Sequence, residues 1–219
     1  MRHLVIDTAS EALSIALFSD GTLVGHVHEI AGRGHAEKLI PAVATLPDGG
    51  LADEIWVDSG PGSFTGIRVG LAAARALAFA WGSALNSYSS LTLLAAMARA
   101  DGADGKTLSI ALTGGHGELF WQEFDRAALT PLAPAASLPI GQLAEHAMAP
   151  VLYGTGAEAL VCARGSGEAR LLYPDARMAL LIPHDQMQPG ADARYGRGAD
   201  ATLPPAKAAA AVPTPSESD

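Results

Sequence analysis

The pair Asp7–Thr8 is the first place where the residue types suggest chemistry. It follows the apolar run His3–Ile6, which predicts a buried strand that ends in an acid and a hydroxyl. Carboxylate and hydroxyl oxygens are suitable ligands for a divalent cation, which can in turn hold a phosphate. Asp is also frequent in turns, where its side chain bonds the backbone, so a single Asp-Thr pair is weak evidence for a site.

The second place is the glycine-rich stretch Asp58–Gly66, which joins a predicted strand at Glu54–Val57 to a predicted helix that runs to Trp81. A strand, a tight turn and a helix in this order present backbone N–H groups to an anion, and Ser63 or Thr65 can cap the helix. The candidate phosphate contacts are therefore Asp7, Thr8, Gly60, Gly62 and Ser63.

The glycine spacing weakens the phosphate hypothesis. Dinucleotide-binding loops carry G-x-G-x-x-G, whereas Gly66 comes one residue late. Phosphate loops end in Gly-Lys-Ser or Gly-Lys-Thr, whereas Ile67 and Arg68 follow Gly66 here. The alternative is that these glycines let the helix pack tightly against the sheet.

The predicted helix carries a ridge of small residues, Gly66, Gly70 and Ala74, at four-residue steps. Glycine inside a helix costs about 1 kcal/mol relative to alanine, so two of them indicate that something packs closely there. That neighbour is either the core of the chain itself or a helix of a partner. In the second case the expected interface combines this ridge with a helix that begins at His35, and its residues are His35, Leu39, Gly66, Gly70 and Ala74.

Three histidines and a glutamate invite a metal or acid–base interpretation. His35 and Glu37 lie two residues apart, which puts their side chains on different faces of a helix, so a structural role is favoured. His26 and His28 share a strand face without a further ligand nearby in the sequence, which favours solvated histidines. A metallopeptidase would use all four residues, but the chain has no H-E-x-x-H motif, and we expect no metal site.

The composition bounds the class of protein. The chain has 219 residues, of which 49% are hydrophobic and 17% charged, enough for a sizeable core in one domain or two small ones. The formal net charge of -9 argues against a surface that holds nucleic acid by itself. The single cysteine, Cys162, excludes an internal disulfide and fits a reducing cytoplasm. We expect neither a signal peptide nor a membrane span.

The order of the predicted elements shows a weak internal duplication. The chain opens with three antiparallel strands at His3–Asp7, Leu13–Phe18 and Thr22–Ile30. The pattern of strand, polar turn and strand returns at Lys106–Leu112 and Glu118–Phe124, which suggests two related subdomains.

A glycine- and aspartate-rich break at residues 101–105 suggests where the two subdomains meet. We expect the first at residues 1–103, the second at 104–203 and a disordered tail at 204–219. The proline- and alanine-rich stretch Ala127–Pro139 is predicted to be an irregular crossing.

Several segments together resemble the TsaB (YeaZ-like) family. They are Leu4–Leu17, Arg33–Pro41, Gly60–Gly70, Ser89–Leu91 and, near the end, Tyr195–Asp200. The match is strong over residues 1 to about 100 and thinner afterwards, and the run GPGSFTG is specific.

The resemblance implies an α/β fold of two related actin-like, heat-shock-ATPase-like (ASKHA) subdomains, with mixed sheets flanked by helices. It also implies a non-catalytic scaffold and dimerisation subunit of the cytoplasmic complex that makes N6-threonylcarbamoyladenosine in tRNA. In that family the partners are the catalytic subunit TsaD and the ATPase TsaE, and tRNA is reached indirectly through the complex. Homodimers form through helices of the first subdomain. No cofactor is bound tightly, but ATP or ADP can lie at a subunit interface.

Two departures bear on catalysis. The catalytic relatives hold a metal with two histidines four residues apart, and by approximate alignment this chain has Tyr88 and Thr92 there, neither of them a good ligand. The family's Asp-Ala-Arg run at the first turn of the second subdomain is replaced by Thr113-Gly114-Gly115, which weakens any nucleotide function of the cleft. We expect no catalytic residue. The alternative is a small ASKHA-type ATPase or phosphotransferase that uses Asp7 and Thr8 at a metal–phosphate site.

Overall fold

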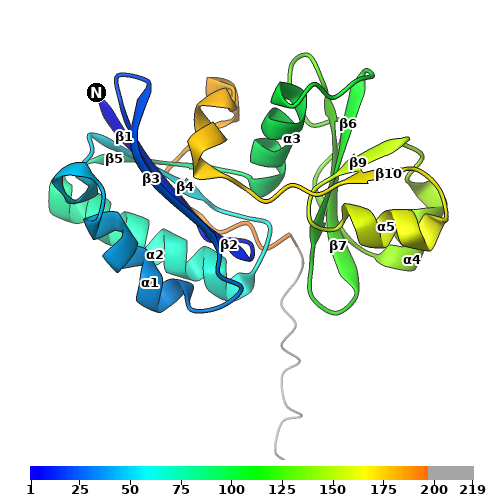
Figure 1. Ribbon diagram of the computed structural model, residues 1–219, viewed down its shortest axis with the longest axis horizontal. Coiled ribbons are helices and arrows are strands. Elements are labelled where there is room, and N and C mark those ends of the chain that lie inside the picture. Colours follow the sequence, from blue (N-terminus) through cyan, green and yellow to red (C-terminus); the bar gives the residue numbers. More distant parts are fainter. Residues whose placement is uncertain (197–219) are drawn as a thin grey trace, which may run out of the picture.

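The computed structural model describes residues 1–196, which form two β-sheets with helices on their outer faces (Figure 1). The strands of the first sheet are β1 (Arg2–Asp7), β2 (Ala12–Ser19), β3 (Thr22–Ile30), β4 (Glu54–Asp58), β5 (Ala84–Tyr88) and β11 (Gln188–Pro189). Those of the second sheet are β6 (Thr107–Thr113), β7 (Glu118–Asp125), β8 (Ala136–Pro139), β9 (Val151–Tyr153) and β10 (Glu168–Arg170).

The helices separate into outer pairs and a central connection. The α-helices are α1 (His35–Ala44), α2 (Phe64–Trp81), α3 (Ser90–Ala100), α4 (Ile140–His146) and α5 (Ala157–Arg164). Three short 3-10 helices are η1 (Pro47–Gly50), η2 (Ala176–Leu181) and η3 (His184–Gln186). α1 and α2 lie outside the first sheet, α4 and α5 lie outside the second, and α3 lies between the sheets (Figure 1). Within residues 1–196, no helix combines the length and apolarity that crossing a bilayer requires.

The two halves of the chain repeat one topology. Each begins with an antiparallel meander, β1-β2-β3 in the first half and β6-β7-β8 in the second. Two more strands then extend the sheet in parallel from the first strand of the meander, β4 and β5 in one half and β9 and β10 in the other. This repetition confirms the predicted fold of two related α/β units with mixed sheets flanked by helices.

Two sequence predictions about the organisation of the chain are wrong. The stretch predicted as an irregular crossing contains β8, which pairs with β7 at the edge of the second sheet, where proline is tolerated. Residues 174–196 were expected in the second subdomain, but β11 pairs with β5 and η2 packs against β1 and β2, so this segment returns to the first sheet. The boundary near residue 103 stays a prediction, and the tail at 204–219 lies outside the described residues.

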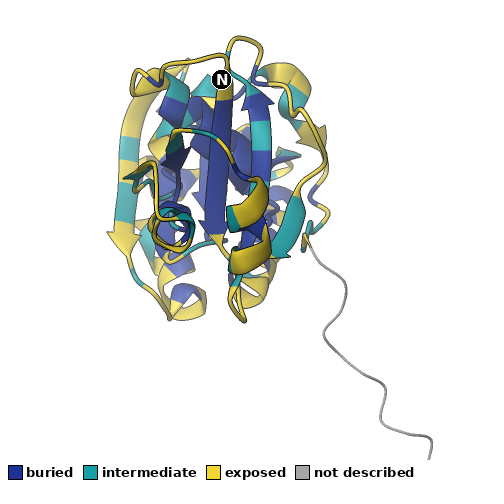
Figure 2. Ribbon diagram, turned by 90° about the vertical axis from the view of Figure 1, so that its right-hand side faces the viewer, coloured by how far each residue is buried: buried dark blue, intermediate teal, exposed yellow. Residues whose placement is uncertain are grey.

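A shared apolar core joins the two sheets. The central strands are buried, whereas the helices present exposed outer faces (Figure 2). One cluster unites Val5 and Tyr88 of the first sheet with Leu94 of α3 and with Ile110 and Phe124 of the second sheet, all of them fully buried. Burial of each such side chain stabilises the folded state by about 1.5–3 kcal/mol. Helix α3 is therefore part of the core that joins the two sheets.

Helix α2 approaches the β1–β2 turn so closely that only glycine fits. A Cβ atom added to Gly66 would lie 1.9 Å from the carbonyl oxygen of Thr8, and one added to Gly70 would lie 2.5 Å from the Thr8 hydroxyl oxygen. The Ser63 hydroxyl caps the helix by accepting from the Gly66 N–H at 3.2 Å, as one of the two predicted caps. The small-residue ridge therefore faces the core of its own chain, and the partner-helix interpretation of Gly66, Gly70 and Ala74 is wrong.

We expect Gly66→Ala to destabilise the protein, because the new methyl group can be placed only by moving α2 away from the first turn. Overpacking of this kind costs about 1–3 kcal/mol, which corresponds to a fall in Tm of about 2–4 °C per kcal/mol in a chain of this size. The control is Gly141→Ala in α4, where nothing lies within 4 Å of an added Cβ. Thermal unfolding followed by circular dichroism should separate the two variants, and equal Tm values would contradict the close approach.

Candidate functional site

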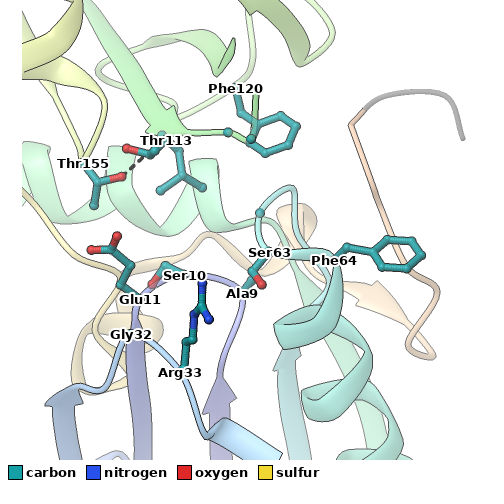
Figure 3. Close-up of a pocket in the computed structure, with 14 residues that line it drawn as sticks. Ala9, Ser10, Glu11, Gly32, Arg33, Ser63, Phe64, Thr113, Phe120 and Thr155 are labelled. Carbon is teal, nitrogen blue, oxygen red and sulfur yellow. Dashed lines mark hydrogen bonds between the residues drawn. The ribbon is translucent and has the colours of Figure 1, made fainter. Parts of the chain in front are cut away.

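A cleft of about 500 Å³ opens between the two sheets (Figure 3). The first half contributes the β1–β2 turn, the loop before α1 and the turn before α2, and the second half contributes the end of β6, the turn after it and the turn before α5. The lining residues are Ala9, Ser10, Glu11, Gly32, Arg33, Gly62, Ser63, Phe64, Leu112, Thr113, Gly114, Gly115, Phe120 and Thr155.

The cleft holds one charged group of each sign among these residues. Glu11 and Arg33 rise from the loops of the first half toward Thr113 and Thr155 of the second (Figure 3). The Thr113 N–H donates to the Thr155 hydroxyl at 3.0 Å, which ties β6 to the turn before α5. A guanidinium can bind a carboxylate or a phosphate, and the first turn of α2 at Ser63 adds backbone N–H groups. The cleft can therefore hold an anionic group, but its lining contains no cluster of acids.

The five predicted phosphate contacts do not come together in the cleft. Gly62 and Ser63 line it, and their contact with a phosphate stays a prediction. The prediction is wrong for Asp7 and Thr8, which are 0% and 1% exposed and lie behind the lining, where the Thr8 hydroxyl donates to the Gly66 carbonyl at 2.8 Å. Gly60 is also buried, under Ile67 and the Arg194 backbone.

Asp7 instead belongs to a buried acid pair at the ends of adjacent parallel strands. The register of β1 on β4, in which Ile6 pairs with Val57, sets Asp7 beside Asp58, close enough for each carboxyl group to act on the pKa of the other. The Tyr88 hydroxyl, at the end of β5, donates to Asp7 Oδ2 at 3.1 Å. Asp58 accepts from the Gly60 N–H at 2.7 Å and from the Ser90 hydroxyl at 2.6 Å. Three strand ends and the start of α3 thus meet in one polar cluster.

Burial dominates the electrostatics of this cluster. It raises the pKa of Asp58 to about 6, against the hydrogen bonds from Ser90 and Gly60, which lower it. Burial and the neighbouring charge of Asp58 raise the pKa of Asp7 well above its usual range. Burial and the charge of Asp7 likewise raise the pKa of Tyr88. All three shifts favour the protonated, neutral forms, so the cluster carries less negative charge than three such groups would carry in water.

The predicted interface residues are also placed differently from expectation. His35 is 8% exposed, and its Nε2 lies 3.2 Å from the Ala12 carbonyl oxygen, so its role is structural. Leu39 is buried in the core between α1, α2 and the first sheet. With the small-residue ridge of α2 also buried, these five residues cannot contact a partner directly. The exposed faces of the same helices remain available.

The two strand histidines differ in their surroundings. His26 is exposed, and His28 is half-buried with its Nδ1 3.0 Å from the Ser14 hydroxyl, so it is less solvated than expected. Among the residues that the structure describes, no three His, Cys, Asp or Glu side chains group as metal ligands would.

Sequence reasoning missed Glu11 and Arg33 in the cleft and Asp58 in the acid pair. A clue was present for Asp58, because it ends a strand just before a glycine-rich turn, as Asp7 ends β1. No local pattern marks Arg33, which reaches the cleft only because the β3–α1 loop lies beside the β1–β2 turn.

The raised pKa of Asp58 makes stability depend on pH. Between its usual pKa of 3.8 and about 6, the folded protein keeps a proton that the unfolded chain has released. The resulting stabilisation is complete below the unfolded pKa and is lost as the pH rises through the folded pKa. We therefore expect the free energy of unfolding of the wild type, relative to Asp58→Asn, to fall between about pH 4 and pH 7. Urea unfolding of both proteins measures this difference, and a constant value would contradict it.

Comparisons with known proteins connect this geometry to a family. The sequence model described as TsaD: tRNA N6-adenosine threonylcarbamoyltransferase matches residues 17–153. The tRNA threonylcarbamoyladenosine biosynthesis protein TsaB of Escherichia coli (strain K12) is 37% identical over 132 residues, which cover 58% of this chain and 56% of that protein. The TsaB protein of Bacillus subtilis (strain 168) is 36% identical over 104 residues, 45% of each chain. The chain thus spans about half the length of the curated relatives that it matches.

The fold also matches a solved structure. YeaZ from Pseudomonas aeruginosa superposes with a TM-score of 0.70 at 26% sequence identity, covering 83% of this chain and 89% of that one. The structural match therefore extends well beyond the aligned sequence segments and includes both sheets.

Proposed function

The chain belongs to the TsaD (tRNA N6-adenosine threonylcarbamoyltransferase) family, within which it is TsaB-like or YeaZ-like, and from this premise we propose that it takes part in making threonylcarbamoyladenosine in tRNA. Its proposed role is that of a non-catalytic scaffold that pairs with a TsaD-like catalytic subunit. A TsaE-like ATPase joins the pair, tRNA is held mainly by the other subunits, and the complex works in the cytoplasm.

The state of the two strand ends supports a non-catalytic role. Phosphotransfer in a cleft of this kind needs ionised acids that can reach a cation and its phosphate. At the end of β1, Asp7 is buried beneath the cleft lining, beside Asp58 and bonded to the Tyr88 hydroxyl. At the end of β6, the equivalent position is Thr113. Neither strand end presents an acid to the cleft.

The exposed faces of α1 and α2 suggest where the catalytic partner binds. The two helices contact each other on the outside of the first sheet (Figure 1). Phe79 of α2 is 92% exposed, Ala72 and Ala76 precede it on the same face, and Ile40 of α1 is 48% exposed. Aromatic side chains are enriched at the cores of protein interfaces, and here the exposed ring has further exposed apolar residues beside it. We propose this face for the catalytic partner and, in its absence, for a homodimer.

We expect Phe79→Asp to abolish capture of the TsaD-like subunit, because the charge would have to be buried in an apolar contact. Substitution of a hot-spot residue usually costs about 2 kcal/mol or more. The affinity should therefore fall by at least about tenfold, which corresponds to about 1.4 kcal/mol. The matched control is Met148→Asp, since Met148 is 84% exposed in the second half of the chain. Both variants should keep the wild-type Tm. Capture that survives Phe79→Asp, or fails equally in both variants, would contradict the proposed face.

Reconstitution tests the scaffold role itself. The purified chain alone should neither hydrolyse ATP nor modify tRNA, and the TsaD-like subunit alone should be inactive or nearly so. Mixing the two with the TsaE-like ATPase should restore threonylcarbamoylation of tRNA, measured by mass spectrometry of the nucleosides. Full activity of the catalytic subunit without this chain would refute the proposal.

The cleft supports one alternative, a small ASKHA-type ATPase or phosphotransferase. Its lining brings Arg33 together with Gly62 and Ser63 at the start of α2, which suits a phosphate group. Calorimetric titration of the isolated chain with Mg-ATP decides between the two functions. Micromolar binding that is lost in Arg33→Ala would favour the alternative, whereas ATP or ADP that binds only after the partner is added would place the nucleotide at the subunit interface.

A further inference from the structure

The hydrogen bonds of the acid pair are unequally distributed between its two members. Both oxygens of Asp58 accept from neutral donors, Oδ1 from the Gly60 N–H and Oδ2 from the Ser90 hydroxyl. Asp7 accepts at Oδ2 from the Tyr88 hydroxyl, and the Ala9 backbone N–H also acts on this carboxyl group, but Oδ1 is fully buried and makes no hydrogen bond of ordinary geometry among the described residues. An ionised Oδ1 would therefore be a poorly compensated buried charge, which is a costly arrangement in a protein.

Within residues 1–196, the side chains that bond to the pair include no cation. β1, β4 and β5 contribute Asp7, Asp58 and Tyr88, and α3 contributes the neutral Ser90. Asp175, at the start of η2, is a further acidic group whose charge raises the pKa of Tyr88. The Arg177 guanidinium bonds both oxygens of Asp175, and the Nδ1 atom of His28 lies 3.9 Å from Asp175 Oδ1.

We propose that Asp7 is a neutral carboxylic acid at neutral pH and that its Oδ1 donates a hydrogen bond to the Asp58 carboxylate, so that one proton links the ends of β1 and β4. In this state every oxygen of the pair has a partner. Asp7 accepts from Tyr88 and donates to Asp58, and Asp58 accepts from Asp7, Gly60 and Ser90. The directions of the two pKa shifts agree with this assignment, since Asp7 is the member held well above its usual range and its hydrogen bond lowers the pKa of Asp58.

The shared proton acts on the elements that Asp58 positions. Asp58 fixes the backbone of Gly60 in the turn before α2 and, through Ser90, the first residue of α3. The Ser90 hydroxyl also lies 2.9 Å from the Pro61 carbonyl oxygen, which closes the network on the same turn. Asp7 is thus a positioning residue for the wall of the cleft and for the helix that joins the sheets. Its neutral state also removes the charge that a metal–phosphate role at this bend would require.

Carbon-13 NMR of aspartate side-chain carboxyl groups tests the proposal directly, with Asp7→Asn and Asp58→Asn used to assign the two resonances. The Asp7 resonance should keep the shift of a protonated acid at neutral pH, while Asp58 titrates with a midpoint of about 6. An Asp7 resonance that reaches the ionised shift below pH 7 would overturn the proposal.

The pH midpoint of the Asp58 titration in the Asp7→Asn variant gives a second readout. A merely structural role of Asp7 would predict no particular direction for a change in this midpoint. The amide that this substitution introduces can accept from Tyr88 and donate to Asp58 as the neutral acid does, so the midpoint should stay within about half a pH unit of the wild-type value. If Asp7 were ionised, the substitution would remove a neighbouring negative charge and lower the midpoint by more than about one pH unit.

Thermal unfolding at neutral pH completes the test with a control that has neither a donor nor an acceptor. Asp7→Asn should melt within about 2–4 °C of the wild type, whereas the similarly sized Asp7→Leu should melt well below it because Tyr88 and Asp58 lose a partner. Equal destabilisation by the two substitutions would overturn the neutral-donor assignment. If Asp7→Leu does not fold, the NMR titration of the wild type still decides.

Discussion

The structure depends on one close contact, between the first turn of α2 and the backbone of the β1–β2 turn. An added Cβ at Gly62 would lie 2.0 Å from the Ala9 carbonyl oxygen, and one at Gly66 would lie 1.9 Å from that of Thr8. Backbone can approach backbone this closely only where side chains are absent. The contact fixes the start of α2 over the ends of β1 and β4, which covers the acid pair and forms one wall of the cleft.

The second half of the chain repeats this close contact at glycines, but with different polar groups. The glycines before α5 approach the end of β6, and an added Cβ at Gly154 would lie 2.4 Å from the Ala111 carbonyl oxygen. There, however, the strand end carries Thr113, whose N–H is bonded by Thr155, in place of a buried acid. The duplication thus preserves the packing of helix on strand but not the chemistry.

The ridge of small residues and the exposed face of α2 illustrate how one helix serves two neighbours. Gly66, Gly70 and Ala74 pack inward, and Ala72, Ala76 and Phe79 point outward. Both sets follow helical spacing, so both are compatible with a partner helix when only the sequence is considered. The inward set meets the Thr8 carbonyl oxygen at Gly66 and the Thr8 hydroxyl at Gly70, which explains its glycines, whereas the outward set ends in an aromatic side chain that is almost fully exposed.

The sequence by itself determined the opening three-stranded meander, the helix after the glycine-rich turn, the duplicated strand–turn–strand pattern and a cap for that helix at either Ser63 or Thr65. It also favoured a structural role for His35. These features follow from local spacing, capping chemistry and turn residues. The tertiary structure alone decided that the glycine ridge faces inward, that β8 completes the second meander and that residues 174–196 return to the first sheet. It also decided that Asp7 lies beside Asp58, which is 51 residues away in the chain. Periodicity shows which residues share a face, but the neighbour of that face depends on strand pairing between distant segments, and this pairing leaves no local pattern.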